Sequence, residues 1–393
     1  MKLFVIGFGQ AGGKIADLFL EYDTRTKQRS IVRALAINSA KSDLMGLKTI
    51  SMEDRLLIGQ SITKGHGVGA DNQLGAKVAQ EDIYTIQSAI DKRGTHQTDA
   101  FLVIAGLGGG TGSGGAPVIS KRLKELYTEP VYALGVLPAS DEGSLYTLNA
   151  ARSFMTLINV ADCLFLFDNE SWKQEGETLG EAYSHINEEI VRRLSVIIGA
   201  GEAVGSKAEV GDMVVDSSEI INTLSTGGVA AIGYAIEEIP GKTGGVMGRL
   251  KSQFKKERGS IDRLDTTTRI ASLVRRAVMG RLTISCDVKT AEKALILVAG
   301  PPEELNRMGI EKSRRWVEGL ISGTEVRGGD YPIPNSKFVA STVLLSGVSN
   351  IPRIKEIQKA ATEAQERIKD FESKKEEKFG NLMESDDSLE PLF

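Results

Sequence analysis

The chain has 393 residues, of which 41% are hydrophobic and 25% charged, with a net charge of −4 and only two cysteines and three histidines. This composition is that of a folded protein with room for two domains, and it argues against a disulfide framework, a histidine metal cluster and a nucleic-acid-binding surface as the main function. No apolar run approaches the ~20 residues that cross a bilayer, and the N-terminal apolar stretch is too short for a signal peptide, so we expect a cytoplasmic protein without membrane insertion.

The first predicted strand covers residues 3–6, and a glycine-containing turn and a helix over 13–22 follow it. The turn, 7–12, reads Gly-Phe-Gly-Gln-Ala-Gly, which fits the GxGxxG pattern of dinucleotide-binding folds. In such a fold the second strand ends in an acidic residue, whereas the second predicted strand here, 32–37, is followed by Asn38. An oxidoreductase that binds NAD therefore stays as an alternative, weakened by Asn38 and by the lack of a candidate proton donor.

A second glycine-rich turn occupies residues 65–71 and precedes a long predicted helix over 73–93. Its glycines allow backbone conformations with positive φ that other residues rarely adopt. The turn is either a mobile surface loop or a segment that wraps a ligand.

The most informative stretch lies between a buried strand, 101–105, and a helix predicted over 117–127. Six of the eight residues in 108–115 are glycine. A loop with so few side chains can take positive φ repeatedly, close around a phosphate and present backbone N–H donors at the start of a helix. Thr111 and Ser113 would add hydroxyl donors. A flexible linker is the alternative, and it does not fit a position between a buried strand and a helix.

Strands and helices continue to alternate after this loop, with strands over 131–137 and 164–167 and a helix over 144–160 between them. This alternation, with strands that are apolar on both faces, predicts a doubly wound parallel sheet of Rossmann type. Ligands bind such sheets at the carboxyl ends of the strands, and Glu142 and Asn169 follow two of those ends.

A long helix is predicted over 179–199. Tyr183 and Asn187 are four positions apart near its start and therefore lie on the same face. Taken alone, they are an ordinary polar pair on the flank of a helix.

The second half is predicted to form a smaller α/β domain with a mixed sheet, without a glycine loop or an acid–base cluster. Its strands are predicted over 229–236, 294–299, 326–331 and 339–346, and its helices over 266–279 and 302–321. We divide the chain into a ligand-binding domain (1–178), a central helix (179–199), a C-terminal domain for packing and assembly (200–350), a charged helix (351–379) and a disordered acidic tail (380–393).

Apolar residues at spacings of three and four run from Ile354 to Phe371 on a segment crowded with lysine and glutamate. This stripe fits a coiled-coil seam or a helix packed on its own domain, and we expect the second because the stripe is shorter than three heptads. Residues 380–393 are acidic and small, which predicts disorder, and they end in Leu392-Phe393. That apolar end is either an unattached terminus or a docking segment for an unknown partner.

Residues 108–114, Gly-Gly-Gly-Thr-Gly-Ser-Gly, are similar to the phosphate-loop signature of the tubulin/FtsZ superfamily of GTPases. The resemblance covers roughly residues 2–350 and implies a Rossmann-type GTPase domain, a long central helix, GTP or GDP and Mg²⁺ as ligands, and head-to-tail filaments. Gln10 and Glu219 resemble tubulin and the short chain resembles FtsZ. The whole is most similar to the archaeal CetZ family, which implies a role in cell shape; a division-ring protein of the FtsZ type is the alternative.

The resemblance also implies which residues contact the nucleotide. Tyr183 would stack on guanine, Asn187 would hydrogen-bond the edge of the base, and Gln10 would lie near Mg²⁺, directly or through water. Tyr146 stands where FtsZ proteins carry a basic residue. The full set of implied contacts is Gly9, Gln10, Ala11, Gly12, Asn38, Gly69, Ala70, Asp71, Gly108, Gly109, Gly110, Thr111, Gly112, Ser113, Glu142, Asn169, Tyr183 and Asn187.

Asp216 and Glu219 are the candidate catalytic residues. Their spacing fits a capping box, with Asp216 as N-cap and Glu219 three residues into a helix. The resemblance gives them a second role, because the corresponding loop of tubulin and FtsZ carries two acids that face the nucleotide of the neighbouring subunit. Val214 replaces the usual Asn. A scaffold that assembles but hardly hydrolyses GTP is the remaining alternative.

Overall fold

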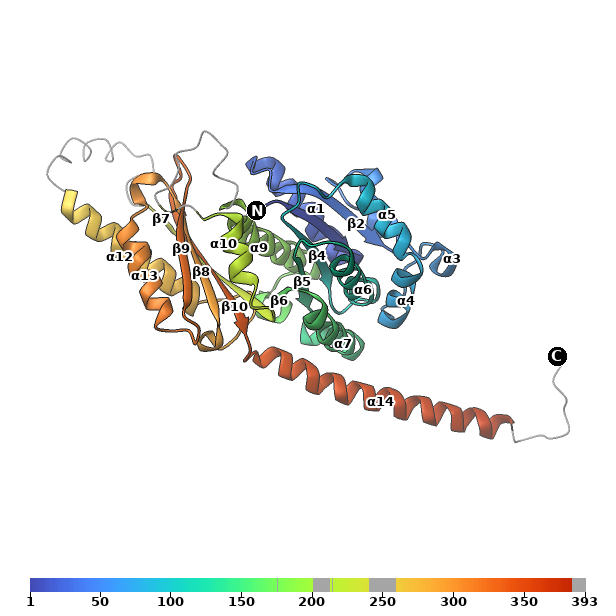
Figure 1. Ribbon diagram of the computed structural model, residues 1–393. Coiled ribbons are helices and arrows are strands. Elements are labelled where there is room, and N and C mark those ends of the chain that lie inside the picture. The colour runs from blue at the N-terminus through green and yellow to red at the C-terminus, as the bar shows by residue number, and fades with distance from the viewer. Residues whose placement is uncertain (175, 201–212, 214, 240–258, 384–393) are drawn as a thin grey trace.

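The computed structural model describes residues 1–174, 176–200, 213, 215–239 and 259–383. Its described strands form one ten-stranded sheet in the order β3-β2-β1-β4-β5-β6-β7-β10-β8-β9 (Figure 1). The strands are β1 (Leu3–Phe8), β2 (Ile31–Asn38), β3 (Arg55–Leu57), β4 (Ala100–Gly106), β5 (Val131–Leu137), β6 (Cys163–Asp168), β7 (Val229–Glu238), β8 (Lys293–Gly300), β9 (Glu325–Pro332) and β10 (Phe338–Val348).

The first half of the sheet is parallel, as predicted. Strands β1 to β6 pair in parallel, and β1, β5 and β6 are buried along their whole length, which explains why they read as continuous apolar runs. The second half is mixed, because β10 runs antiparallel to both β7 and β8 while β8 and β9 are parallel. A short parallel pairing of β6 with β7 joins the halves.

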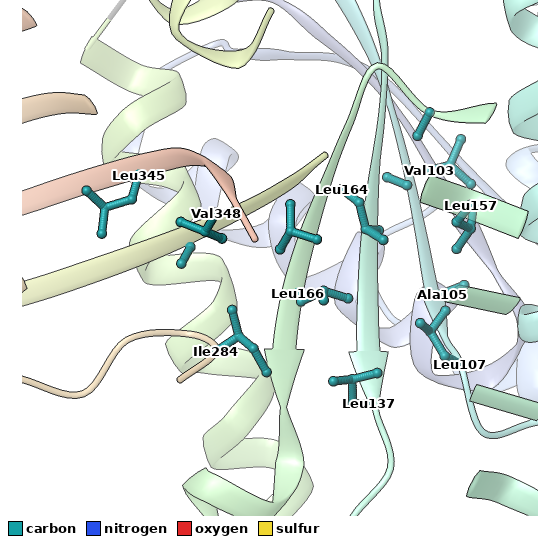
Figure 2. Packing of buried hydrophobic residues seen from close by; sticks show 14 of the residues in the cluster. Val103, Ala105, Leu107, Leu137, Leu157, Leu164, Leu166, Ile284, Leu345 and Val348 are labelled. Atoms are coloured by element: carbon teal, nitrogen blue, oxygen red, sulfur yellow. The ribbon is translucent and has the colours of Figure 1, made fainter. Parts of the chain in front are cut away.

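Helices cover both faces of the sheet. One apolar core packs α1, α9 and α10 on one face, and the other packs α4 to α7 and α12 to α14 on the opposite face. Figure 2 shows the second core running from Val103 on β4 through Leu164 on β6 to Leu345 on β10. The helices are α1 (Gly9–Thr26), α2 (Lys41–Met45), α3 (Gln60–Thr63), α4 (Asn72–Glu81), α5 (Ile83–Arg93), α6 (Gly110–Leu126), α7 (Ser144–Val160), α8 (Asn169–Trp172), α9 (Leu179–Ala200), α10 (Ser217–Leu224), α12 (Gly259–Met279), α13 (Arg307–Glu318) and α14 (Pro352–Met383).

The glycine loop is shorter than predicted, because α6 begins at Gly110 and not at Pro117. None of the residues in 108–115 adopts positive φ. Several of the glycines, Gly114 among them, are instead required by close packing, because a Cβ would clash with neighbouring atoms. A Cβ on Gly114 would lie 2.2 Å from the carbonyl oxygen of Asn72 at the start of α4. The low helix propensity of glycine is therefore overridden by a helix–helix contact that admits no side chain.

Two other predicted helices are also divided. The helix predicted over 73–93 breaks at Asp82, whose carboxylate accepts a hydrogen bond from the backbone N–H of Gly59 (2.6 Å). The helix predicted over 302–321 is a 3₁₀ turn at Pro302–Glu304 followed by α13. The predicted boundary region over 199–213 lies almost wholly outside the described residues.

The charged helix was expected to pack on its own domain rather than to form a coiled-coil seam, and it does pack against the body of the chain. Ile354, Ile357 and Ala361 are buried in the second core, where α14 packs on α7 of the first half. Beyond that contact α14 runs away from the body of the molecule (Figure 1), and Phe371 is exposed. The helix extends to Met383, into the predicted tail, and residues 384–393 lie outside the described residues.

Among the described residues, no helix combines the length and the apolar character that crossing a bilayer requires.

Candidate functional site

A cavity of about 530 Å³ opens at the carboxyl ends of the parallel strands, where the fold class predicts a ligand. Loops that follow β1, β2, β4, β5 and β6 meet there with the start of α9. The predicted contact residues that line it are Gln10, Ala11, Asn38, Gly69, Ala70, Gly108, Gly109, Gly110, Thr111, Gly112, Glu142, Asn169, Tyr183 and Asn187.

One wall of the cavity is almost entirely backbone. In the turn over 65–71, Gly65, Gly67, Gly69 and Ala70 all have positive φ, so this turn, rather than 108–115, is the one that uses glycine's conformational freedom. Facing it is Gly109, the N-cap of α6, where a Cβ would meet no protein atom within 4 Å. The start of α6 thus presents free backbone to the cavity, which suits an anion.

Four predicted contacts do not line the cavity, and each has another role. Gly9 has φ +75° and lies against the backbone of Gly112, and a Cβ on Gly12 would lie 2.1 Å from the carbonyl oxygen of Ile104. The Asp71 carboxylate caps α4 by accepting from the N–H of Leu74 (3.0 Å). The remaining one, Ser113, donates its hydroxyl to the carbonyl of Gly109 and not to the cavity.

The opposite wall carries the aromatic and amide side chains. Tyr183 is about one-third exposed, and burial and the neighbouring Glu142 carboxylate raise the pKa of its hydroxyl to about 12. The Glu142 carboxylate also accepts from the N–H of Ala139 (2.8 Å) and the amide nitrogen of Asn169 (3.4 Å). The amide oxygen of Asn169 is buried without a hydrogen-bond partner among the described residues.

Sequence reasoning missed several residues of the cavity: Lys14, Asp43 and His66 line it, and so does Tyr146, which packs on Gly108. Lys14 is four residues after Gln10, so their shared helix face was the signal that could have found it. Asp43 accepts a hydrogen bond from the amide of Asn38 (3.0 Å), a pairing that no local motif announces.

The cavity suits Mg²⁺ only if a ligand supplies most of its oxygens. The described residues hold no group of three or more His, Cys, Asp or Glu side chains able to bind a metal ion. Mg²⁺ is commonly held by one or two protein groups together with phosphate oxygens and water. The Gln10 amide on the cavity wall fits such a contact.

The two candidate acids lie near the amino ends of the parallel strands, opposite the cavity. Ser217, at the start of α10, donates its hydroxyl to Asp99 (3.1 Å), and Asp99 accepts from the N–H of Lys2 (2.7 Å). Asp99 and Lys2 directly precede β4 and β1, whose opposite ends border the cavity. The seven residues of β4 span ~23 Å, so Asp216 and Glu219 do not reach the cavity of their own chain.

The capping box is only half formed. The Asp216 carboxylate is the N-cap of α10 and accepts from the N–H of Glu219 (3.0 Å) and the hydroxyl of Ser218 (2.6 Å), and these bonds lower its pKa. The Glu219 carboxylate does not return to the cap; it accepts from the Arg327 guanidinium on β9 (3.0 Å).

Comparisons with known proteins cover almost the whole chain. Residues 2–176 match the family described as Tubulin/FtsZ family, GTPase domain, and residues 176–363 match Tubulin-like CetZ, C-terminal domain. A curated relative, Tubulin-like protein CetZ1 of Haloferax volcanii, is 57% identical over 94% of each chain.

Two solved structures from Haloferax volcanii are similar along their whole length. The GDP-bound monomer of CetZ1 has a TM-score of 0.81 at 54% identity, covering 93% of this chain and 100% of that one. The GTPγS-bound protofilament of CetZ2 has a TM-score of 0.82 at 41% identity, covering 94% and 100%.

Proposed function

The chain belongs to the tubulin/FtsZ family, within its CetZ group, and on that basis we propose that it binds GTP, polymerises head to tail and hydrolyses GTP between subunits. The match of the C-terminal half to the CetZ domain favours this over a division-ring protein of the FtsZ type. The match to the GTPase domain of this family also argues against the alternative of an NAD-dependent oxidoreductase.

The cavity supports binding of a guanine nucleotide. The phosphates would lie along the backbone of 108–112 and the turn over 65–71, with Lys14 as a nearby positive charge. Tyr183 would stack on the base and Asn187 would hydrogen-bond its edge. Asn169 supports this orientation, because its amide oxygen is unpaired among the described residues and could accept a hydrogen bond from the N–H groups of guanine.

In hydrolysis, the acids of one subunit would act on the GTP of the next. Asp216 and Glu219 orient the water that attacks the γ-phosphorus, and a carboxylate accepts the proton of that water as the bond to the β-phosphate oxygen breaks and GDP leaves. Mg²⁺ bound to the phosphates would supply positive charge against the charge that develops in transfer.

The observation that carries this proposal is the placement of cavity and acids at opposite ends of the same parallel strands. One chain cannot bring them together, whereas two chains stacked end to end can. This head-to-tail contact is heterologous, so it repeats into a filament.

Concentration dependence tests the shared site. GTP hydrolysis per subunit should be negligible in dilute protein and rise steeply once sedimentation detects polymer. A rate per subunit that does not depend on concentration would show that each chain hydrolyses alone. GTP binding without hydrolysis at any concentration would favour the scaffold alternative.

We further propose a cytoplasmic role in cell shape, with the tail as a docking segment. The acidic residues and the terminal Leu392-Phe393 of 384–393 fit a short motif that binds the groove of a partner protein. Deleting 384–393 should leave polymerisation and hydrolysis intact and remove partner capture or cellular localisation; a truncated chain that fails to polymerise would contradict this.

A further inference from the structure

The carboxylates of the two candidate acids are held by different hydrogen bonds. Asp216 is fixed by its own helix, because its carboxylate closes the first turn of α10. Glu219 has a longer side chain with no such bond, and Arg327 is 108 residues away in the sequence. Among the described residues, Arg327 is the side chain that holds this carboxylate (Nη1 to Oε1, 3.0 Å).

The Arg327 side chain is itself held in place by a second carboxylate, that of Glu325. It follows Glu325 by two positions on β9, so both side chains lie on the same face of the strand. Two of its nitrogens, Nε and Nη2, each lie 2.9 Å from one Glu325 oxygen, and the other Glu325 oxygen contacts Lys293 of β8 (3.0 Å). The neighbouring carboxylates of Glu325 and Glu219 raise the pKa of Arg327, so it stays charged.

A flexible glutamate needs such a support to act as a catalytic group. Glu219 is partly exposed, and an unsupported glutamate side chain moves among several rotamers. The planar guanidinium of Arg327 binds the Glu325 carboxylate with two nitrogens and has a third nitrogen for the Glu219 carboxylate. Lysine cannot reproduce this geometry. With Oε1 held by Arg327, the second oxygen of Glu219 is left for a water molecule.

We propose that Arg327 is a positioning residue for hydrolysis: it fixes Glu219 toward the nucleotide of the neighbouring subunit while contacting no nucleotide in its own chain. This inference rests on the proposed function of Glu219 between subunits. It predicts separate effects on hydrolysis and on GTP binding, because Arg327 lies far from the cavity of its own chain. Loss of Arg327 should lower the hydrolysis rate without changing how tightly that chain binds GTP.

The test compares Arg327→Met and Arg327→Lys with wild type, measuring GTP affinity, polymer mass by sedimentation, and phosphate release per assembled subunit. Arg327→Met should hydrolyse about 10-fold more slowly per assembled subunit, within the range that a misplaced catalytic group costs, with unchanged GTP affinity. Arg327→Lys should be intermediate, since it keeps the charge and loses the fork. The matched control is Arg314→Met, which breaks a similar partly buried pair with Glu311 (3.1 Å) on α13 and should behave as wild type.

A double-mutant cycle with Glu219→Gln separates this inference from the function on which it rests. Adding Arg327→Met to Glu219→Gln should cause no further loss; a further loss equal to that in wild type would overturn the inference. Normal hydrolysis by Arg327→Met polymers, or a defect in polymer mass alone, would also overturn it. Normal hydrolysis by Glu219→Gln would instead overturn the proposed role of Glu219.

Discussion

Gly109 and Gly110 are adjacent in the sequence but meet different surroundings. A Cβ on Gly109 would face the open cavity, and its φ of −71° is ordinary for any residue. A Cβ on Gly110 would lie 2.5 Å from Val68 and 2.8 Å from the N–H nitrogen of Asp71. Of the two, only Gly109 can be changed without disturbing the protein, so a defect there reports on the ligand.

Gly109→Ala should lose GTP affinity by about 10-fold or more, since a methyl group forced into a filled site costs 1–3 kcal/mol. Its melting temperature without nucleotide should match wild type. Calorimetric titration with GTP and a thermal scan measure the two effects. Normal GTP affinity in this variant would place the phosphates elsewhere.

Tyr183→Ala tests the base side of the same cavity. Loss of stacking should cost about 1–3 kcal/mol, which weakens GTP binding roughly 5–150-fold. Tyr84→Ala on α5 is the control, because that tyrosine is 74% exposed and does not line the cavity. Titration with GTP and ATP measures both affinity and selectivity; ATP bound as tightly as GTP by wild type would contradict base reading.

Among the elements, α4 and α6 are the pair that shapes the backbone wall. Both begin in cavity loops, and they touch where α6 carries glycine, since a Cβ on Gly114 would also lie 2.5 Å from the N–H nitrogen of Ala76. The first turns of these helices are therefore held by packing between backbones.

Gly114→Ala should destabilise the protein, in contrast to Gly109→Ala. The new methyl group must push α4 and α6 apart, at a cost of about 1–3 kcal/mol in the free energy of unfolding. Urea unfolding followed by circular dichroism measures it, with Gly109→Ala as the matched glycine control. Equal stability of the two variants would mean that the helices separate freely.

The strands were the most predictable elements, because each buried run of apolar residues is bounded by polar or glycine turns. The predicted strand over 131–137 and helix over 144–160 coincide with β5 and α7. The predicted helix ends were wrong where a contact with a distant part of the chain sets the boundary. Asp82 accepts a hydrogen bond from Gly59, and Gly110 lies so close to the turn before α4 that only glycine fits. Local propensity holds no information on either contact.

At the scale of the whole molecule, the decisive contacts join residues far apart in the chain. The glycine signature, with the resemblance that it carries, located most of the residues that line the cavity from sequence. The bond from Ser217 to Asp99 spans 118 residues, and it shows that the acids lie opposite the cavity. The sequence named both acids through resemblance, but their distance from the cavity and their support by Arg327 depend on the folded sheet.

Subunits that are defective at opposite ends should therefore complement each other. Asp216→Ala should bind GTP and assemble, and its polymers should persist because their GTP is not hydrolysed. Gly109→Ala should bind GTP poorly while keeping Asp216 and Glu219 intact.

In a mixture, an Asp216→Ala subunit holds GTP and a Gly109→Ala neighbour supplies the acids, so the shared site is complete at one of the four possible ordered contacts. Phosphate release by the mixture should exceed that of either variant alone at the same total concentration, and it should peak near equal proportions. The control replaces Gly109→Ala by the double variant Gly109→Ala/Asp216→Ala, which binds and stacks alike but supplies no Asp216. Rescue by the double variant, or no rescue by either partner, would mean that the acids do not act across the contact between subunits.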